Sequence, residues 1–118
     1  MYYLFLEVYD PAYREDIYLA LQSIGIQRAI NLDAQNLAAA LSDERTFFTG
    51  FFKADKIESG NVLLILAQVS SKDKIGEFLS NLKEGGVDID SRNIINLTLI
   101  PAVLSFSSEH GLQDKDGS

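Results

Sequence analysis

The chain has 118 residues, a mass of 13.1 kDa and a net charge of −7, and 47% of its residues are hydrophobic. This is enough for one domain with its own core, while the lack of cysteine excludes a disulfide scaffold, thiolate zinc sites and thiol nucleophiles. The acidic balance argues against nucleic acid as a partner, because it repels phosphate backbones.

Membrane insertion is not expected either. No apolar run approaches the ~20 residues that a helix needs to cross a bilayer. The chain opens directly into a strand-like run and shows no charged segment followed by an apolar leader. These features predict a cytoplasmic protein.

The first part of the chain predicts a strand, a helix and a second strand. Residues 2–8 (YYLFLEV) form an apolar run of strand length. Asp10 and Pro11 then favour a helix start, since Asp caps helix N-termini and Pro suits the first helical position. Apolar residues at spacings of four and three continue the helix as far as Gly25, a typical C-terminal cap. Residues 26–33 alternate polar with apolar residues, which predicts a half-exposed strand.

The later part repeats this order. Residues 62–69 (VLLILAQV) are a nearly unbroken apolar run and predict a strand. Residues 75–82 place apolar side chains at the spacing of an amphipathic helix, which ends at Gly85 and Gly86. A fourth strand is expected over residues 93–100.

Two segments fall outside this pattern. Residues 34–60 form a long excursion between the second and third strands, and such excursions are usually functional. Residues 107–118 have no periodicity and little apolar content, which predicts a disordered tail. We therefore expect a single domain over residues 1–106.

The predicted order is β-α-β, a long loop, and β-α-β. Two strand–helix–strand units with right-handed crossovers give the α+β ferredoxin-like fold, a four-stranded antiparallel sheet with both helices on one face. The first and third strands are the most apolar and are expected at the centre of the sheet.

Both central strands are apolar on both faces, whereas two helices cover only one face. The residues expected on the uncovered face are Tyr3, Phe5, Leu63 and Ile65. Each would lose roughly 1.5–3 kcal/mol if left in water, and together they would form a larger patch than monomers tolerate. Either the chain self-associates through this face, or the loop over residues 34–60 folds back and covers it.

The turn after the second predicted helix offers a candidate ligand site. Gly85 and Gly86, with Lys83 and Arg92, can hold an anion through backbone N–H groups and two cations. The alternative is a helix cap and a turn with solvated charges.

No catalytic or metal site is predicted. Asp88 and Asp90 can share a metal or act as an acid–base pair, but solvated turn residues have the same pattern. His110 has no ligand partner at metal spacing, and no serine is matched by a histidine as its base.

The long loop carries four phenylalanines bracketed by two cations. These residues are Arg45, Phe47, Phe48, Phe51, Phe52 and Lys53. Exposed phenylalanines are costly and often anchor interfaces. They either insert into a partner protein or seal the sheet or a subunit junction.

The layout resembles the PII nitrogen-regulatory family and its PII-like relatives over residues 2–104. The resemblance rests on GIQRAINLD, a loop of T-loop length, NVLLILAQVS, the glycine turn LKEGGVDID and the last strand SRNIINLTLI. It implies a regulatory and signalling protein, a homotrimer whose open sheet faces line a shared core. It also implies a small molecule bound in the clefts between subunits and a long loop that acts on a protein partner.

Three departures from the family bear on nucleotide as a cofactor. The glycine- and lysine-rich phosphate cradle is reduced to Lys83, Gly85 and Gly86 among acidic neighbours, and residues 97–103 contain no arginine. Residues 34–60 contain no tyrosine, so the nucleotidylated residue of some relatives is missing. The degenerate cradle argues against ATP binding in the PII manner.

Two other functions stay open. An amino-acid-sensing module similar to ACT domains would pair its sheets edge to edge in a dimer and would lack the long loop. A small enzyme is also compatible, because ferredoxin-like sheets carry many activities. A trimer favours the PII-like function, and a dimer favours the ACT-like one.

Overall fold

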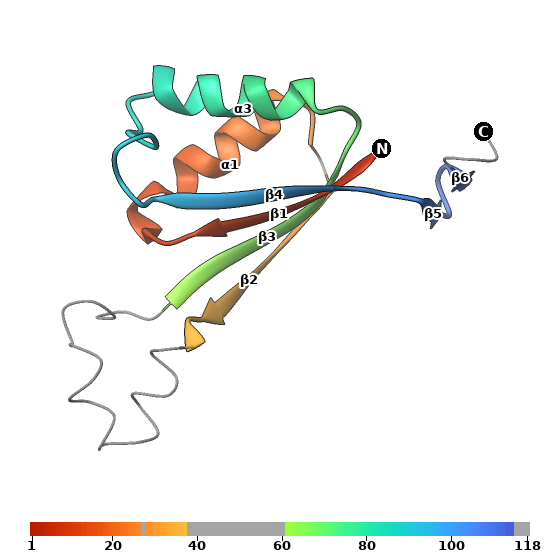
Figure 1. Ribbon diagram of the computed structural model, residues 1–118, viewed down its shortest axis with the longest axis horizontal. Helices are drawn as coiled ribbons and strands as arrows, with labels where there is room; N and C mark the ends of the chain where they lie inside the picture. Colours follow the sequence, from red (N-terminus) through yellow and green to blue (C-terminus); the bar gives the residue numbers. More distant parts are fainter. Residues whose placement is uncertain (27, 38–60, 115–118) are drawn as a thin grey trace.

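The computed structural model describes residues 1–26, 28–37 and 61–114. It contains a four-stranded antiparallel sheet with the order β2-β3-β1-β4 and a separate two-stranded hairpin (Figure 1). The elements are β1 (Tyr2–Val8), η1 (Pro11–Tyr13), α1 (Arg14–Ser23), β2 (Ala29–Gln35), β3 (Asn61–Val69), α3 (Asp73–Glu84), β4 (Ile95–Pro101), β5 (Leu104–Ser107) and β6 (Gly111–Asp114).

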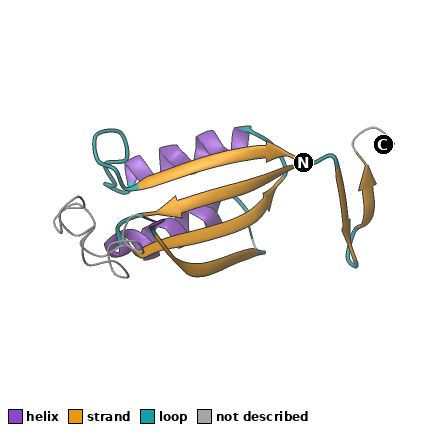
Figure 2. Ribbon diagram, turned by 60° about the horizontal axis from the view of Figure 1, so that its bottom comes forward, coloured by secondary structure: helices purple, strands orange, loops and turns teal. Residues whose placement is uncertain are grey.

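The ferredoxin-like topology is confirmed, with β1 and β3 central and β2 and β4 at the edges. Both helices lie on one face of the sheet, and the other face, called the open face below, is not covered by either helix (Figure 2). Two ends of the sheet matter for function. At the loop end β2 finishes and β3 begins, and at the hairpin end β4 continues into β5.

The predicted start and end of the first helix are confirmed by their caps. The Oδ1 of Asp10 accepts a hydrogen bond from the N–H of Ala12 at 3.0 Å and starts the 3₁₀ turn that leads into α1. Gly25 ends α1 with a φ of +88°, a conformation that glycine adopts at little cost. The N–H of Ile26 still bonds back to the carbonyl of Leu21, so β2 begins later than predicted and takes in residues 34–35.

The core lies between the helices and the covered face of the sheet. Its fully buried members include Leu4, Leu6, Val8, Ile17, Ile65, Phe78, Leu82 and Ile94. Alternate residues of β1 and β3 supply the sheet side, and the amphipathic stripes of α1 and α3 supply the other. No polar side chain is buried in the described part of the chain.

One assignment of residues to faces was wrong. Leu63 and Ile65 were expected on the uncovered face, but they are 6% and 1% exposed because they lie on the helix side. The register pairs Ile65 with the buried Leu6 and pairs Phe5 with Leu66. The residues of β3 on the open face are therefore Val62, Leu64, Leu66 and, at the hairpin end, Gln68. The open face remains apolar, as predicted, but through different residues of β3.

The end of the chain also differs from the expectation of a disordered tail from residue 107. β5 and β6 form an antiparallel hairpin in which Phe106 pairs with Leu112. Gly111 has a φ of +73° and Ser107 accepts a hydrogen bond from the N–H of His110 at 3.0 Å, so the turn between the strands is well formed. Residues 115–118 lie outside the described residues.

Candidate functional site

Three polar side chains gather on the open face at the loop end of the sheet. Glu7 of β1 accepts hydrogen bonds at Oε1 from the hydroxyl of Tyr9 at 2.8 Å and from Nδ2 of Asn96 at 2.9 Å. Asn96 lies on the neighbouring strand directly opposite Glu7, and Leu64 lies opposite on the other side. The three residues form one hydrogen-bonded group, called the Glu7 cluster, beside an otherwise apolar surface.

The cluster favours an ionised carboxylate. The hydrogen bond from Asn96, and then that from Tyr9, lowers the pKa of Glu7 below its ordinary value. Burial and the bond to Glu7 raise the pKa of Tyr9, which therefore stays neutral and donates. The cluster thus places a fixed negative charge on the edge of the apolar face.

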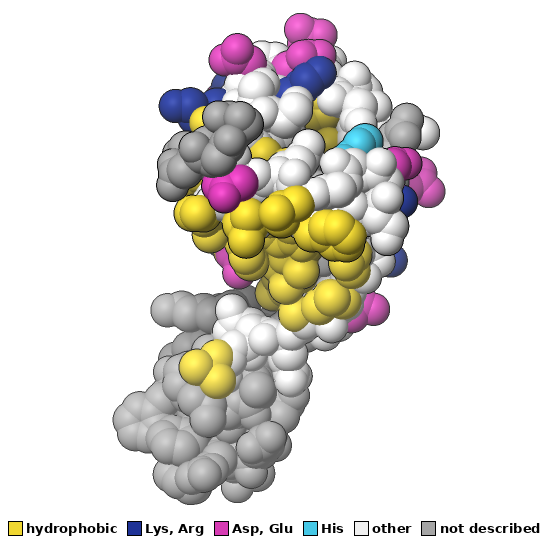
Figure 3. All heavy atoms as spheres, turned by 90° about the vertical axis from the view of Figure 1, so that its right-hand side faces the viewer, with side chains coloured by type: hydrophobic (Ala, Val, Ile, Leu, Met, Phe, Trp, Pro, Cys, Tyr) yellow, Lys and Arg dark blue, Asp and Glu magenta, His cyan; other side chains and the backbone are white. Residues whose placement is uncertain are grey.

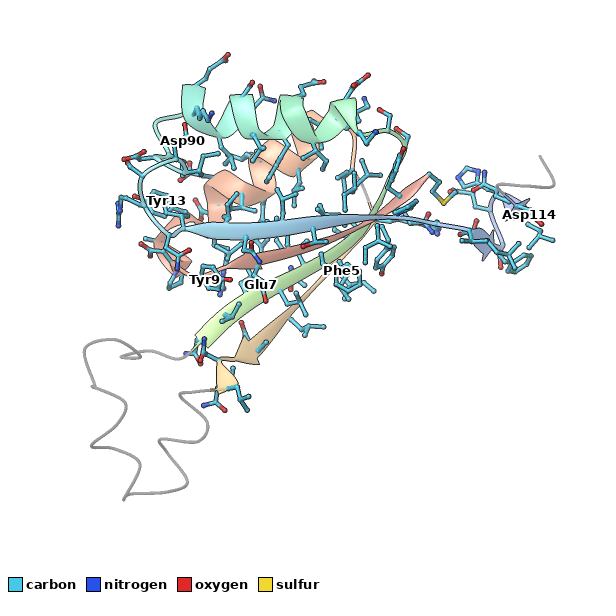
Figure 4. The ribbon with its side chains drawn as sticks, viewed as in Figure 1. Phe5, Glu7, Tyr9, Tyr13, Asp90 and Asp114 are labelled. Atoms are coloured by element: carbon cyan, nitrogen blue, oxygen red, sulfur yellow. The ribbon has the colours of Figure 1, made fainter. Side chains whose placement is uncertain are left out.

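A second group of candidate residues lies at the same end, on the helix side (Figure 4). Here α3 ends in a Schellman motif. The N–H groups of Gly85, Gly86 and Val87 bond at 3.0 Å to the carbonyls of Asn81, Lys83 and Leu82, respectively. These amides are occupied as helix caps, so in this conformation they do not form the anion cradle considered from the sequence.

Lys83, predicted as a ligand-binding cation, is paired with a carboxylate. Its Nζ lies 3.0 Å from Oδ2 of Asp90. The neighbouring Asp88 accepts hydrogen bonds from the N–H and the hydroxyl of Ser91 and thereby shapes the turn. Asp88 and Asp90 are therefore each engaged with a separate partner, and no contact between the two carboxylates supports a shared metal or an acid–base pair.

Arg92, the second predicted cation, joins the turn to the start of the first helix. Its Nη2 lies 3.7 Å from Oδ2 of Asp10, and its Nη1 donates to the hydroxyl of Tyr13 at 2.8 Å. The guanidinium also stacks 5.7 Å from the centre of the Tyr13 ring. Lys83 and Arg92 thus lie at one end of the molecule, each held by an acidic partner.

The ion pairs Lys83–Asp90 and Arg92–Asp10 limit which ligands the turn can bind without rearrangement. Polyphosphate needs free amides and unpaired cations, whereas this turn presents occupied amides and neutralised cations. Among the described residues no group of three or more His, Asp or Glu side chains is placed to hold a metal ion. The phenylalanines and cations predicted on the long loop, Arg45, Phe47, Phe48, Phe51, Phe52 and Lys53, lie outside the described residues.

The open face continues from the Glu7 cluster to the hairpin end as an apolar surface. Its exposed members include Phe5 at 39%, Ile30 at 58%, Leu32 at 43% and Ile100 at 45%. Toward the hairpin end the face is hollowed by a groove of about 420 Å³. The groove is lined by Tyr3, Arg28, Ala29, Ile30, Leu66, Ala67 and Gln68. We call it the sheet groove.

Sequence reasoning missed the Glu7 cluster and the sheet groove. The signal for the cluster was the lone charge in the apolar run of β1, which shares a face with Tyr3 and Phe5 because strand residues alternate. The groove depends on the pairing of Ile30 with Leu66 across two strands. Register of this kind is not visible within either strand alone.

Comparison with known proteins gives the class of the fold. No protein-family model matches the chain, and no curated protein matches it. Among solved structures, the crystal structure of Arabidopsis thaliana PII bound to citrate is similar, with a TM-score of 0.56 and 13% sequence identity. The match covers 99% of this chain and 92% of that protein.

The chain therefore has a PII-like fold of the ferredoxin-like α+β class. The match at this identity concerns the fold, and it extends over the full domain and the C-terminal hairpin. Within the described residues, no helix is both long and apolar enough to span a bilayer.

Proposed function

We propose that this protein is a small PII-like regulatory protein of the cytoplasm. It assembles as a homotrimer through its open sheet faces and binds a small molecule at the clefts between subunits. It acts on a protein partner through the long loop over residues 34–60. The observation that carries the proposal is the apolar open face of a sheet with this fold.

The energetics of that face favour self-association. Phe5 and Ile100 are exposed on β1 and β4, and Ile30 and Leu32 are exposed on the edge strand β2. Burial of such side chains contributes roughly 1.5–3 kcal/mol each, and monomers rarely leave a contiguous patch of this kind in water. A second copy of the same chain offers a surface of matching character and is always present.

The ligand proposal rests on the paired cations. The exposed pairs Lys83–Asp90 and Arg92–Asp10 are worth about 0–1 kcal/mol each. A small anion can therefore displace one carboxylate and take its place on the cation. A guanidinium suits a carboxylate in particular, because its two N–H groups match the two oxygens. The similar PII structure was solved with citrate, so citrate is the first probe.

Signal transfer would follow from the position of these cations. The turn that carries Lys83 and Arg92 lies at the loop end of the sheet, where β2 ends at Gln35 and β3 begins at Asn61. A ligand that binds one arrangement of this end more tightly shifts the population of the segment between those strands. That segment would then present its phenylalanines to the partner in one state and withhold them in the other.

The assembly is tested by light scattering and native mass spectrometry at micromolar concentration. We expect three chain masses for the wild type and one for Phe5→Glu, because the charge would be buried in the centre of the interface. Leu19→Glu is the matched control, since Leu19 is 63% exposed on α1, on the opposite side of the molecule. A monomeric wild type contradicts the proposal, and a dimer favours the ACT-like alternative.

Ligand binding is tested by thermal shift and calorimetry with citrate, other small carboxylates and nucleotides. We expect a carboxylate to raise the melting temperature of the wild type and to lose at least about tenfold in affinity with Arg92→Ala. Arg14→Ala removes a guanidinium that is paired with a different carboxylate, that of Asp33 on β2, and serves as the control. If only nucleotides raise the melting temperature or bind, the proposal that the ligand is a small carboxylate is contradicted.

A further inference from the structure

The C-terminal hairpin has one apolar and one polar face, and its apolar face points away from its own domain. In its register Leu104, Phe106 and Leu112 share one face, and Ser105 and Gln113 share the other. The apolar three are 58%, 70% and 66% exposed. The polar face meets the domain, where Nε2 of Gln68 donates to the hydroxyl of Ser105 at 3.0 Å.

Contacts within one subunit do not explain why the apolar face of the hairpin is exposed. A hairpin of two four-residue strands is marginally stable by itself in water. If only its own domain were available, burying the apolar face would be favourable and exposing the serines would cost little. Figure 3, which views the molecule from the hairpin end, shows hydrophobic side chains gathered over this end. The apolar face of the hairpin is therefore suited to a surface on another molecule.

We propose that the hairpin of each copy of this chain seats Phe106 in the sheet groove of the neighbouring copy. This inference rests on the proposed homo-oligomer and adds the element that joins its subunits. The groove is apolar, with Tyr3, Ile30 and Leu66 among its walls, and its volume of about 420 Å³ is ample for a phenyl ring and its aliphatic neighbours.

The same chain cannot supply both partners of this contact. Ser105 is tied to Gln68, which itself lines the groove, and successive strand residues point to opposite sides. Phe106 therefore points away from the groove of its own subunit. Because the projection and the groove are different surfaces of one molecule, the contact is heterologous, and in the proposed trimer three such contacts close a ring.

Two further features favour a second copy as the occupant. The hairpin follows β4 directly, so it lies next to the end of the sheet whose open face the proposed trimer covers (Figure 1). The charges also match, since Arg28 stands at the groove and Asp114 lies on the hairpin face that carries Phe106. A foreign partner on the hairpin alone would leave Ile30 and Leu32 of the edge strand in water.

The chain contains no cysteine, so engineered disulfides report this contact cleanly. We would combine Phe106→Cys with Ile30→Cys, oxidise the purified full chain gently and separate it under non-reducing conditions. We expect disulfide-linked multimers that collapse to one chain on reduction. Phe106→Cys with Ser80→Cys is the matched control, because Ser80 is exposed on α3 in the helix layer. It should give no such multimers.

Other outcomes separate this inference from the proposed assembly. A disulfide within one chain, or none while light scattering still shows the assembly, overturns the hairpin contact and leaves the oligomer standing. A wild type that is monomeric overturns both. As a second measurement, Phe106→Asp should weaken assembly at least about tenfold, whereas Ser107→Asp, on the polar face of the same strand, should leave it unchanged. Equal assembly of the two variants would contradict the contact.

Discussion

Both faces of the central strands are mainly apolar, but their surroundings are very different. On the helix side, Leu4, Leu6 and Ile65 are almost fully buried against α1 and α3. On the open face, Phe5, Leu64 and Leu66 alternate with them along the same two strands, but neither helix covers them. A strand that is apolar on both sides is typical of a sheet covered on both sides. The apolar residues on the open face of β1 and β3 are therefore of the kind found where a second layer covers a sheet.

On the open face of the two central strands, the polar residues lie at the two ends, and Thr98 lies between them on the edge strand β4. The Glu7 cluster lies at the loop end, and Gln68 lies at the hairpin end, opposite Tyr3. Between them the central strands contribute only apolar side chains to that face. This division is typical of interfaces, which have an apolar centre and a polar rim. In the proposed assembly the two faces would have separate roles: the helix side stabilises the fold, and the open face joins the subunits.

The largest expected effect compares two neighbouring residues of β3 that point to opposite faces. Ile65→Ala should lower the free energy of unfolding by about 2–5 kcal/mol at any protein concentration, because it leaves a cavity in the core. Leu64→Ala should cost less in dilute protein, and its cost should grow with concentration as assembly stabilises the wild type. Denaturant titrations at two protein concentrations measure both effects. Equal losses in dilute protein would show that Leu64 is covered within its own subunit.

Two glycine substitutions in and after α3 should change the free energy of unfolding by a smaller amount, and they test the helix layer without touching the open face. Gly86→Ala should destabilise the fold by about 1–2 kcal/mol, because residue 86 has a φ of +91° and side chains disfavour this region. Gly76→Ala, within α3, should have the opposite effect. A Cβ there meets no atom within 4 Å, so the better helix former should stabilise by about 0.5–1 kcal/mol.

Both glycine variants should leave the oligomeric state unchanged, since neither touches the open face. Thermal unfolding gives the sign of each change, and light scattering gives the state. A change of oligomer with Gly76→Ala would mean that the outer surface of α3 takes part in association, against the separation of roles between the faces.

Local patterns in the sequence were sufficient to predict the fold. The Asp10–Pro11 start, the glycine ends of both helices and the spacing of apolar residues along α3 each depend on neighbours within a few positions. The sequence did not show which alternate residues of β3 point to the helices, because an unbroken apolar run looks the same in both arrangements. Its single polar residue carried the signal: Gln68 shares its face with Leu64 and Leu66.

The candidate sites were less predictable, because they depend on contacts between distant residues. The sequence identified Lys83 and Arg92 as cations but not that Asp90 and Asp10 hold them. The pairing of Arg92 with Asp10 and Tyr13 joins the two halves of the chain and requires the folded topology. The hairpin was missed for another reason: its alternation over residues 104–107 (LSFS) is short and lies beside a polar tail.

The smallest expected effect concerns the Glu7 cluster at the margin of the open face. Because the pKa of Glu7 is lowered in the folded state, its ionised form stabilises the fold above its ordinary pKa of 4.5, and this contribution is lost as the pH falls through the folded pKa. Asn96→Ala removes the largest cause of the shift, so the pKa of Glu7 should rise toward its ordinary value. The variant should therefore be less stable than the wild type above about pH 5, and the difference should narrow in acid.

Thr98→Ala is the matched control, because Thr98 is the next residue of β4 on the same face and lies opposite Phe5. Its stability difference from the wild type should not depend on pH between 3 and 7, the range over which carboxylates titrate. Carboxyl NMR shifts of Glu7 follow the titration directly, and thermal melts follow its effect on stability. If Asn96→Ala leaves the titration of Glu7 where it was, the hydrogen bond across the two strands does not set its charge. Glu7 would then be ionised simply because it is exposed to water.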